Sequence, residues 1–300
     1  PPSVPVVSII SLLSPQLVNN VAIFSFGDSQ AEVLDYIFHN DPRYRTWHDR
    51  SVGWRSGWSS RGLYAEINLQ RILTPVSKCR AKNAFVMLTF GSTDVDINLP
   101  YKRHQKGQTV DLDMFLNEMS TNLWGAVERL REIDRDPVVP VNVHVSLVFP
   151  YVPLPTTDEY WEKTFQNRPA PHKERIQLFE HFVQRVQDLG RAAGVEMRNS
   201  SMSAQGGQQE TCSTVIHVVN VKDVYDRVGF QPFLRQGVVD HHPDYIASQL
   251  IIANKLRGIG GRRLGLDPRL SLFEEYPHVP RDVNTWSVVP RHDYYYYSDS

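Results

Sequence analysis

Cysteine is scarce in this chain of 300 residues, which contains only Cys79 and Cys212. Two cysteines so far apart in sequence exclude a framework of several disulfides, and they exclude a zinc site built from cysteines. They leave the redox compartment open, so the sequence does not decide between a cytoplasmic and a secreted protein. Stability is therefore expected to come from a buried core, and the 41% of hydrophobic residues are enough to build one.

An excess of charge and long apolar runs are also missing. The formal net charge is −1, and proteins that bind nucleic acid or an anionic membrane surface usually carry a basic excess. No run reaches the roughly 18 consecutive apolar residues that a membrane-spanning helix needs. We therefore expect no nucleic-acid partner and no membrane span, while the oligomeric state stays open.

The two ends of the chain lack the patterns of a folded element. Residues 1–20 hold a short apolar patch between prolines, with no basic residue before it. A secretory signal peptide begins with positive charge, so we interpret 1–20 as the leading segment of a processed chain. Residues 261–300 are rich in Pro, Arg, Asp and Tyr and end in HDYYYYSDS. We expect one α/β domain over 21–260, followed by an irregular C-terminal tail.

Four apolar runs rich in β-branched residues predict interior strands, at 21–26, 84–90, 141–149 and 214–221. Their hydrophobicity is continuous, which is typical of strands in a sheet that helices cover on both faces. Helical periodicity predicts helices at 31–38, 61–73, 111–134, 174–194 and 243–258. Alternating strands and helices predict an α/β fold with a mostly parallel sheet, whose site lies at the carboxyl ends of the strands.

Side chains that can carry out acyl transfer follow these predicted strands. The segments are Gly27-Asp28-Ser29, the turn GWRSGWSSRGL (53–63), Gly91-Ser92-Thr93-Asp94 and Asp240-His241-His242-Pro243. Acyl transfer to water needs a nucleophilic hydroxyl, an imidazole base, a carboxylate that orients the base and donors for the oxyanion. Ser29 by itself could be a helix N-cap, for which serine is preferred. The other segments, in this order, favour a serine that is or once was catalytic.

These four segments resemble the sequence blocks of the SGNH/GDSL hydrolase superfamily, and the likeness covers residues 21–258. The resemblance implies a three-layer α/β/α sandwich with a flavodoxin-like, mostly parallel sheet. It implies that Ser29 is the nucleophile and lends its backbone N–H to the oxyanion hole. It also implies that His242 is the base and that Gly57 is a second oxyanion donor, with two neighbouring glycines as competitors.

The chain departs from the family pattern at two positions. The third block of the family has an asparagine whose amide donates to the oxyanion, and this chain has Thr93, whose hydroxyl is shorter and less fixed. The family's carboxylate lies three residues before the histidine, where this chain has Val239, and Asp240 lies two before. We expect Asp240 to orient His242, with His241 as the alternative base.

Three more residues are expected to support the oxyanion site. Asp28 and Gly91 belong to the first and third blocks, and Asp94 is expected to tie the loop after the second strand together. The adjacent residues His241 and His242 could be metal ligands. However, neighbouring side chains point in different directions and no HxxxH or cysteine partner stands nearby, so we expect neither a metal nor another cofactor.

Trp54, Arg55 and Trp58 lie in a loop that should border the site. Aromatic faces and arginine forks are what a sugar or an anionic substrate contacts, although packing within the loop is the alternative for each residue. With the family resemblance, they favour an O-acetylated carbohydrate as the substrate. FGSTDVD (90–96) also resembles, more loosely, a branch of GDS proteins found near polysaccharide genes.

The function predicted from these observations is that of a serine esterase or deacetylase with a Ser-His-Asp mechanism. A carbohydrate O-acyltransferase is one alternative, since related domains transfer acyl groups between sugars. A non-catalytic domain that binds a glycan or a protein is the other. The changed third block and the shifted spacing of Asp240 are the features that motivate it.

Overall fold

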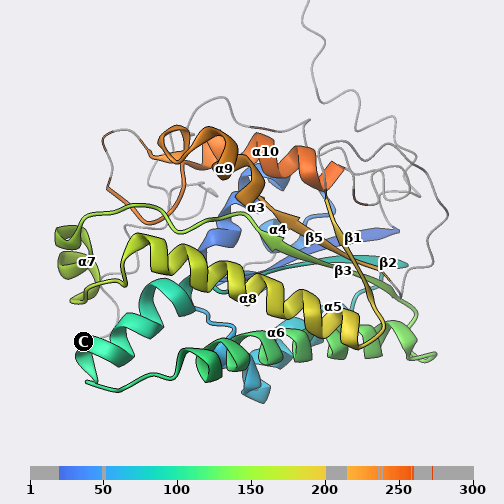
Figure 1. The fold of residues 1–300 in the computed structure, drawn as a ribbon. Coiled ribbons are helices and arrows are strands. Elements are labelled where there is room, and N and C mark those ends of the chain that lie inside the picture. The colour runs from blue at the N-terminus through green and yellow to red at the C-terminus, as the bar shows by residue number, and fades with distance from the viewer. Residues whose placement is uncertain are drawn as a thin grey trace, which may run out of the picture.

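The computed structural model describes residues 20–48, 52–200, 215–235, 237, 239–257, 259 and 272. Its centre is a five-stranded sheet in which all neighbouring strands run parallel, in the order β1-β2-β3-β5-β4 (Figure 1). The strands are β1 (Val21–Gly27), β2 (Asn83–Thr89), β3 (Asn142–Phe149), β4 (Glu196–Asn199) and β5 (Val215–Asn220). The predicted α/β class with a mostly parallel sheet is confirmed.

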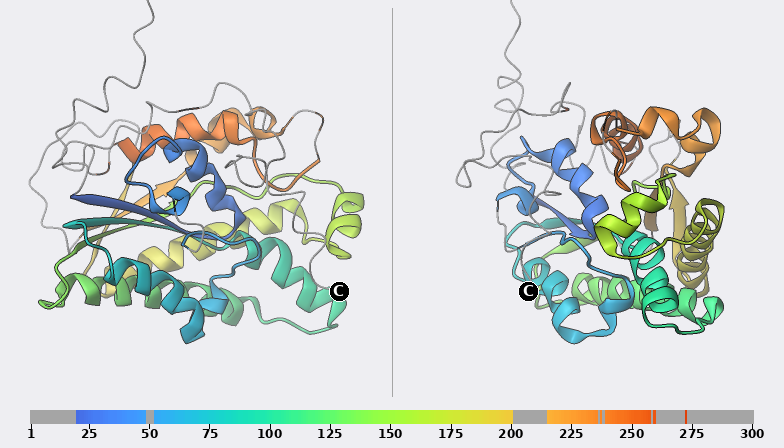
Figure 2. Two further views of the ribbon diagram at one scale, coloured as in Figure 1. Left: turned by 180° about the vertical axis from the view of Figure 1, so that it is seen from behind. Right: turned by 90° about the vertical axis from the view of Figure 1, so that its left-hand side faces the viewer.

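Helices cover both faces of this sheet and give the molecule three layers (Figure 2). One face carries α5 (Glu66–Ser77), α6 (Leu112–Arg135) and α8 (His172–Ala192). The other face carries α3 (Glu32–Phe38), α9 (Lys222–Val228) and α10 (Tyr245–Arg257). The long helices α6 and α8 present an apolar stripe to the sheet, as the periodicity of the sequence predicts. The buried side of α10 is mixed, because it also contains Ser248, Gln249 and Lys255.

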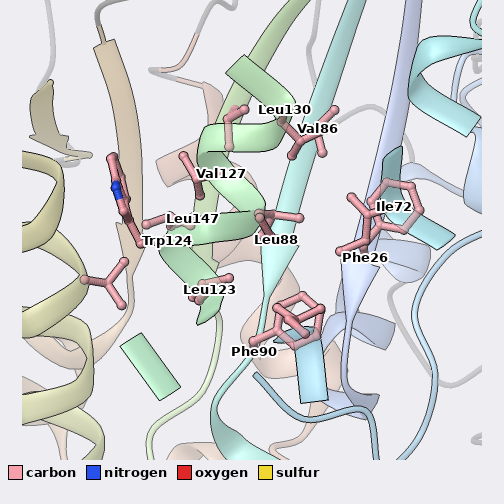
Figure 3. Packing of buried hydrophobic residues seen from close by; sticks show 14 of the residues in the cluster. Phe26, Ile72, Val86, Leu88, Phe90, Leu123, Trp124, Val127, Leu130 and Leu147 are labelled. Carbon is pink, nitrogen blue, oxygen red and sulfur yellow. The ribbon is translucent and has the colours of Figure 1, made fainter. Parts of the chain in front are cut away.

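Alternate residues of a strand enter different cores, because successive side chains point to opposite faces of the sheet. In β1, Phe24 and Phe26 join the cluster under α5, α6 and α8, whereas Val21 and Ile23 join the cluster under α3 and α10. Figure 3 shows part of the first cluster, with α6 residues against β2 residues. Burial on both sides explains why the strands are apolar throughout rather than alternating.

Several elements have no clear signal in the sequence. The edge strand β4 has the polar sequence EMRN and is only half-buried, so it lacks the apolar run of an interior strand. The short helices α7 (Asp158–Phe165) and α9 were not predicted either. The wide helical turns η3 (Asp94–Asn98) and η4 (Tyr101–Gln105) follow β2 directly. Of these, α7 matters most for the site.

The order of the strands reverses beside β1. Tyr44 makes a parallel bridge to Ile23 at the free edge of β1, and the Ile23 N–H donates to the carbonyl oxygen of Arg43 at 2.9 Å. The next full strand, β2, pairs with the other edge of β1. In open α/β sheets, ligands bind outside the carboxyl ends of the strands where the chain changes direction in this way.

The predicted end segments 1–20 and 261–300 lie outside the described residues, apart from Asn20 and Leu272. The assignment of 21–260 to one domain stays a prediction. Within the part of the chain that the structure describes, no helix has both the length and the apolar character needed to cross a membrane.

Candidate active site

Ser29 lies at the carboxyl end of β1. The strand ends at Gly27, where a Cβ atom would lie 1.8 Å from the carbonyl oxygen of Thr89, so only glycine allows β1 and β2 to approach this closely. Ser29 then starts the helical turn η1 (Ser29–Ala31), which continues directly into α3. The N-cap of this turn is Asp28 and not Ser29, because the Asp28 carboxylate accepts the backbone N–H of Gln30 at 3.0 Å. The serine hydroxyl is thereby left for another partner.

That partner is His242, which lies 213 residues further along the chain. Oγ of Ser29 and Nε2 of His242 are 2.7 Å apart. The loop carrying His242 precedes α10, and α10 packs beside α3 on the same face of the sheet (Figure 1). The ring of Tyr245, in the first turn of α10, packs on Tyr36 of α3, and its hydroxyl donates to the carbonyl oxygen of Ser29 at 3.3 Å. Packing between two helices therefore brings the histidine to the serine.

Asp240 reaches His242 in spite of the two-residue spacing. Oδ1 of Asp240 accepts the Nδ1 hydrogen of His242 at 2.9 Å and the backbone N–H of His242 at 3.2 Å. An aspartate often turns back to bond a backbone N–H two residues on, and here the same turn brings the carboxylate to the ring. Val239, which occupies the family's aspartate position, is more than half exposed. Ser29, His242 and Asp240 thus lie in a continuous hydrogen-bonded line.

The charge on Asp240 is strongly favoured. Burial alone would raise its pKa, but the opposite pull of the two imidazoles, His242 first and then His241, is larger. The net result is a pKa well below the usual range, because both neighbours favour the ionised carboxylate. A carboxylate that stays ionised can stabilise an imidazolium next to it.

His241 points away from the serine. Its ring packs among the rings of Tyr160, Trp161 and Phe165 of α7, and its Nδ1 lies 2.7 Å from the hydroxyl oxygen of Tyr160. His242, and not its neighbour, therefore faces Ser29. Among the contacts that the structure describes, His241 has none with Ser29.

Asp28 joins the ends of β1 and β2. Its Oδ2 accepts the backbone N–H and the hydroxyl of Ser92, at 3.1 and 2.7 Å, and the backbone N–H of Thr93 at 3.3 Å. The side chain is fully buried, and burial raises its pKa to about 7 in spite of these donors. Asp28 consequently acts as a brace between two strand ends, and its own protonation state is close to balanced near neutral pH.

Gly91 lets the second strand end pack tightly on α8. Its φ is +113°, and a Cβ atom would lie 2.5 Å from the ring of Phe182. Thr93, two residues later, is buried and begins the helical turn that contains Asp94. Its backbone N–H is held by Asp28, so its position is fixed relative to Ser29. A role of its hydroxyl at an oxyanion stays a prediction.

The loop with Gly57 is pinned at two points. The backbone N–H of Arg55 donates to the carbonyl oxygen of Gly27 at 2.9 Å, next to Ser29. Asp94 accepts the backbone N–H and the hydroxyl of Ser60, at 2.7 and 2.6 Å, and burial raises the pKa of this carboxyl group. Gly57 lies between these anchors, exposed and with a φ of +71°. The anchor at Gly27 ties the loop of Gly57 to the end of β1, where a backbone N–H could donate to an oxyanion. This role of Gly57 stays a prediction.

The two tryptophans of the loop do not offer open aromatic faces. Trp54 is 5% exposed and its indole N–H donates to Asp35 of α3 at 2.8 Å. Trp58 is 7% exposed and packs edge-on against Phe90 in the core. The expectation that both contact a substrate is therefore not carried further, and packing within the loop explains them. Arg55 is exposed.

Asp240, His241 and His242 form the one group of potential metal ligands found among the described residues, with ligand atoms within 4.8 Å of one another. Two of these atoms already have hydrogen-bond partners: Nδ1 of His242 bonds Oδ1 of Asp240 at 2.9 Å, and Nδ1 of His241 lies 2.7 Å from the hydroxyl oxygen of Tyr160. That the site holds no metal stays an expectation.

Sequence reasoning missed Tyr160, whose hydroxyl donates to Asp240 at 3.1 Å. It lies on α7, whose start is marked by the capping residue Thr157 and two acidic residues, but no spacing in the sequence connects Tyr160 to a residue 80 positions away.

No protein-family model and no curated protein matches this chain. What the fold and the site define is an α/β protein with an all-parallel sheet and a hydrogen-bonded Ser-His-Asp arrangement at the carboxyl end of its first strand.

Proposed function

We propose that this protein is a serine esterase or deacetylase of the SGNH type. The single observation that carries the proposal is the line from Ser29 Oγ to His242 Nε2, at 2.7 Å, and from His242 Nδ1 to Asp240 Oδ1, at 2.9 Å. Both distances lie within the range that general-base catalysis needs. His242 is buried, Ser29 and Asp240 are half-buried, and the three are joined by hydrogen bonds, which supports a preformed site.

In the first half of the reaction, Nε2 of His242 takes the hydroxyl proton of Ser29. Oγ forms a bond to the ester carbonyl carbon, and the carbonyl π electrons move to the oxygen. When the tetrahedral intermediate collapses, the bond to the alcohol oxygen breaks and the alcohol leaves with the proton from His242. Asp240 stabilises the imidazolium that exists between these two steps.

In the second half, water replaces the alcohol. His242 takes a proton from water, the hydroxide oxygen attacks the acyl carbon, and collapse releases the carboxylic acid. The Ser29 oxygen recovers its proton from His242. The protein ends in its starting state, and water is the only reactant besides the ester.

The oxyanion needs donors that are fixed before the reaction. The backbone N–H of Ser29, at the start of the continuous helical stretch η1–α3, is the first proposed donor. The backbone N–H of Gly57 is the second, because its loop is anchored to the carbonyl of Gly27. Thr93 is the third, in the position of the family's asparagine.

An O-acetylated carbohydrate remains the proposed substrate class. With Trp54 and Trp58 buried, its support is reduced to the exposed Arg55 and the family resemblance. Fold analogy alone does not establish chemistry, so the acyl chemistry and the sugar are tested separately.

The acyl chemistry is tested with an aryl acetate and a serine-directed phosphonate. The wild-type protein should hydrolyse the ester and be labelled at Ser29, whereas Ser29→Ala should do neither. Ser77→Ala, which removes a hydroxyl from α5, is the matched control and should behave as wild type. If neither ester turnover nor labelling occurs in the wild-type protein, the domain is non-catalytic and the proposal is wrong.

The sugar is tested with acetylated oligosaccharides in water, with and without an unacetylated acceptor. Acetate release without acceptor supports the esterase. Product that forms only when the acceptor is present identifies an acyltransferase instead.

A further inference from the structure

One oxygen of the candidate site attracts an unusual set of groups. Oδ1 of Asp240 accepts the Nδ1 hydrogen and the backbone N–H of His242, at 2.9 and 3.2 Å, and the hydroxyl of Tyr160 at 3.1 Å. Nδ1 of His241 lies 3.2 Å from the same oxygen. The Asp-His hydrogen bond is therefore embedded in a network that also includes a phenol and a second imidazole.

The protons of this network can be assigned from the chemistry of its members. A carboxylate only accepts hydrogen bonds, so the hydroxyl proton of Tyr160 is directed to Asp240. The hydroxyl oxygen of Tyr160 is then free to accept the Nδ1 hydrogen of His241, 2.7 Å away. This gives a chain from His241 through Tyr160 to Asp240, and hydrogen bonds in such a chain strengthen one another.

Packing around α7 holds Tyr160, the middle member of this hydrogen-bonded series, in place. The side chain of Thr157 caps the start of α7, and the amide of Gln105 in η4 donates to the carbonyl of Gln166, just past the helix end, at 2.6 Å. Trp161, which follows Tyr160, is buried against His241 and against the guanidinium of Arg175. Tyr160 is therefore placed by a helix fixed at both ends, independently of the loop that carries Asp240 and His241.

The contact between Tyr160 and Asp240 matters because Asp240 lies only two residues before His242. Oδ1 of Asp240 makes a local turn with the backbone N–H of His242, and the same oxygen must also hold the imidazole ring. Both of these bonds come from His242, so they tie the carboxylate only to its own loop. A donor from a different element defines where Oδ1 must lie, and Tyr160 supplies it.

We propose that Tyr160, supported by His241, is a positioning residue that holds the Asp240 carboxylate in line with His242. This inference rests on the proposed function, because the line it maintains is the one that activates Ser29. Neither residue touches the nucleophile, so both act through Asp240.

The first experiment tests whether Tyr160 and Asp240 interact, and it does not require the protein to be active. The free energy of unfolding is measured in urea for wild type, Tyr160→Phe, Asp240→Asn and the double variant. Loss of a hydrogen bond to a charged group should raise the unfolding equilibrium constant about 10-fold in Tyr160→Phe. In the Asp240→Asn background the same change should have a clearly smaller effect, about 3-fold, because the amide oxygen can still accept the hydroxyl but carries no charge. Equal effects in both backgrounds would overturn the inference.

The second experiment measures positioning. The rate of phosphonate labelling and the kinetic constants for an aryl acetate are compared for wild type and Tyr160→Phe. The labelling rate and kcat should fall about 10-fold while KM stays the same, since the hydroxyl acts on the base and not on the substrate. Unchanged kcat and labelling rate in Tyr160→Phe would overturn positioning.

Tyr44→Phe is the matched control, because Tyr44 also donates from a phenol to a buried carboxylate, that of Asp35, at 2.8 Å. It should destabilise the protein without changing kcat. His241→Ala should weaken the coupling between Tyr160 and Asp240, and full coupling in that variant would remove His241 from the proposal.

The two proposals can fail separately. If the wild-type protein is neither labelled nor active, the esterase proposal is wrong, and the unfolding cycle still decides whether Tyr160 acts on Asp240. If the wild-type protein is active and Tyr160→Phe has the same kcat and labelling rate, only the positioning role is wrong.

Discussion

Asp28 and Asp240 both belong to the candidate site, and the protein holds them in opposite ways. Asp28 lies between two strand ends and accepts neutral donors, and its pKa is raised to about 7. Asp240 lies in a loop before α10, beside two imidazoles, and its pKa is held well below the usual range. Neutral donors do not offset full burial, whereas two histidines more than offset it. One carboxylate therefore serves as a brace and the other as a fixed negative charge.

Among these predictions, replacement of His242 is expected to cause the largest loss of activity. His242→Gln should reduce aryl acetate hydrolysis on the order of 10⁴-fold or more, because the serine loses its base. His241→Gln should reduce it by about 10-fold at most, since that ring does not reach Ser29. Steady-state kinetics of both variants checks the contrast. Comparable losses would show that the two histidines share the role.

The next largest effect compares the loss of kcat when each of the two carboxylates, Asp240 and Asp28, is replaced by an amide. Asp240→Asn should lower kcat on the order of 10³–10⁴-fold, because an amide can hold the wrong tautomer of His242. Asp28→Asn should lower kcat by about 10-fold or less, because Asp28 contacts backbone and Ser92 rather than the base. Kinetic constants at one pH, with circular dichroism spectra of both variants, provide the test. A larger loss in Asp28→Asn would mean that the brace is part of the chemistry.

The strand-end region should be sensitive to added volume. Gly91→Ala is expected to lower the free energy of unfolding by about 3 kcal/mol, because its Cβ atom would overlap Phe182 and its φ is positive. Gly57→Ala has no atom within 4 Å of the new Cβ, so only the cost of a positive φ remains, about 1 kcal/mol. Urea unfolding distinguishes the two. An equal cost would show that the approach of β2 to α8 is not tight.

The smallest effect is the dependence of stability on pH. The folded protein keeps a proton on Asp28 up to about pH 7, whereas the unfolded chain releases it near pH 3.8. The folded state thus binds more protons between these values, and the stability from Asp28 is lost as pH rises through about 7. From pH 5 to pH 8 the wild-type protein should lose about 2.5 kcal/mol relative to Asp28→Asn. Urea unfolding at both pH values measures this difference, and parallel pH profiles would contradict it.

Much of the fold could be predicted from the sequence. The apolar runs of β1, β2, β3 and β5 and the periodicity of α6 and α8 reflect burial on one or both faces, which a linear pattern records directly. The edge strand β4 was not predicted because its sequence is polar and it buries little. The helix α7 begins with a capping threonine and two acidic residues, but at eight residues it is too short to show a periodic pattern. The strand-end rule pointed to Ser29 and to the loop of His242, which packing then brings within 2.7 Å.

By itself, the sequence determined the class of fold and the segments that could carry acyl chemistry, because hydrophobic periodicity and strand-end residues are local properties. Tertiary structure alone decided the rest: that Asp240 reaches His242, that His241 turns to Tyr160, and that Trp54 and Trp58 pack inward. These outcomes depend on the placement of α7, α10 and α3 relative to one another, and no spacing along the chain records such distances. The physical reason is that side-chain orientation follows from burial against distant elements.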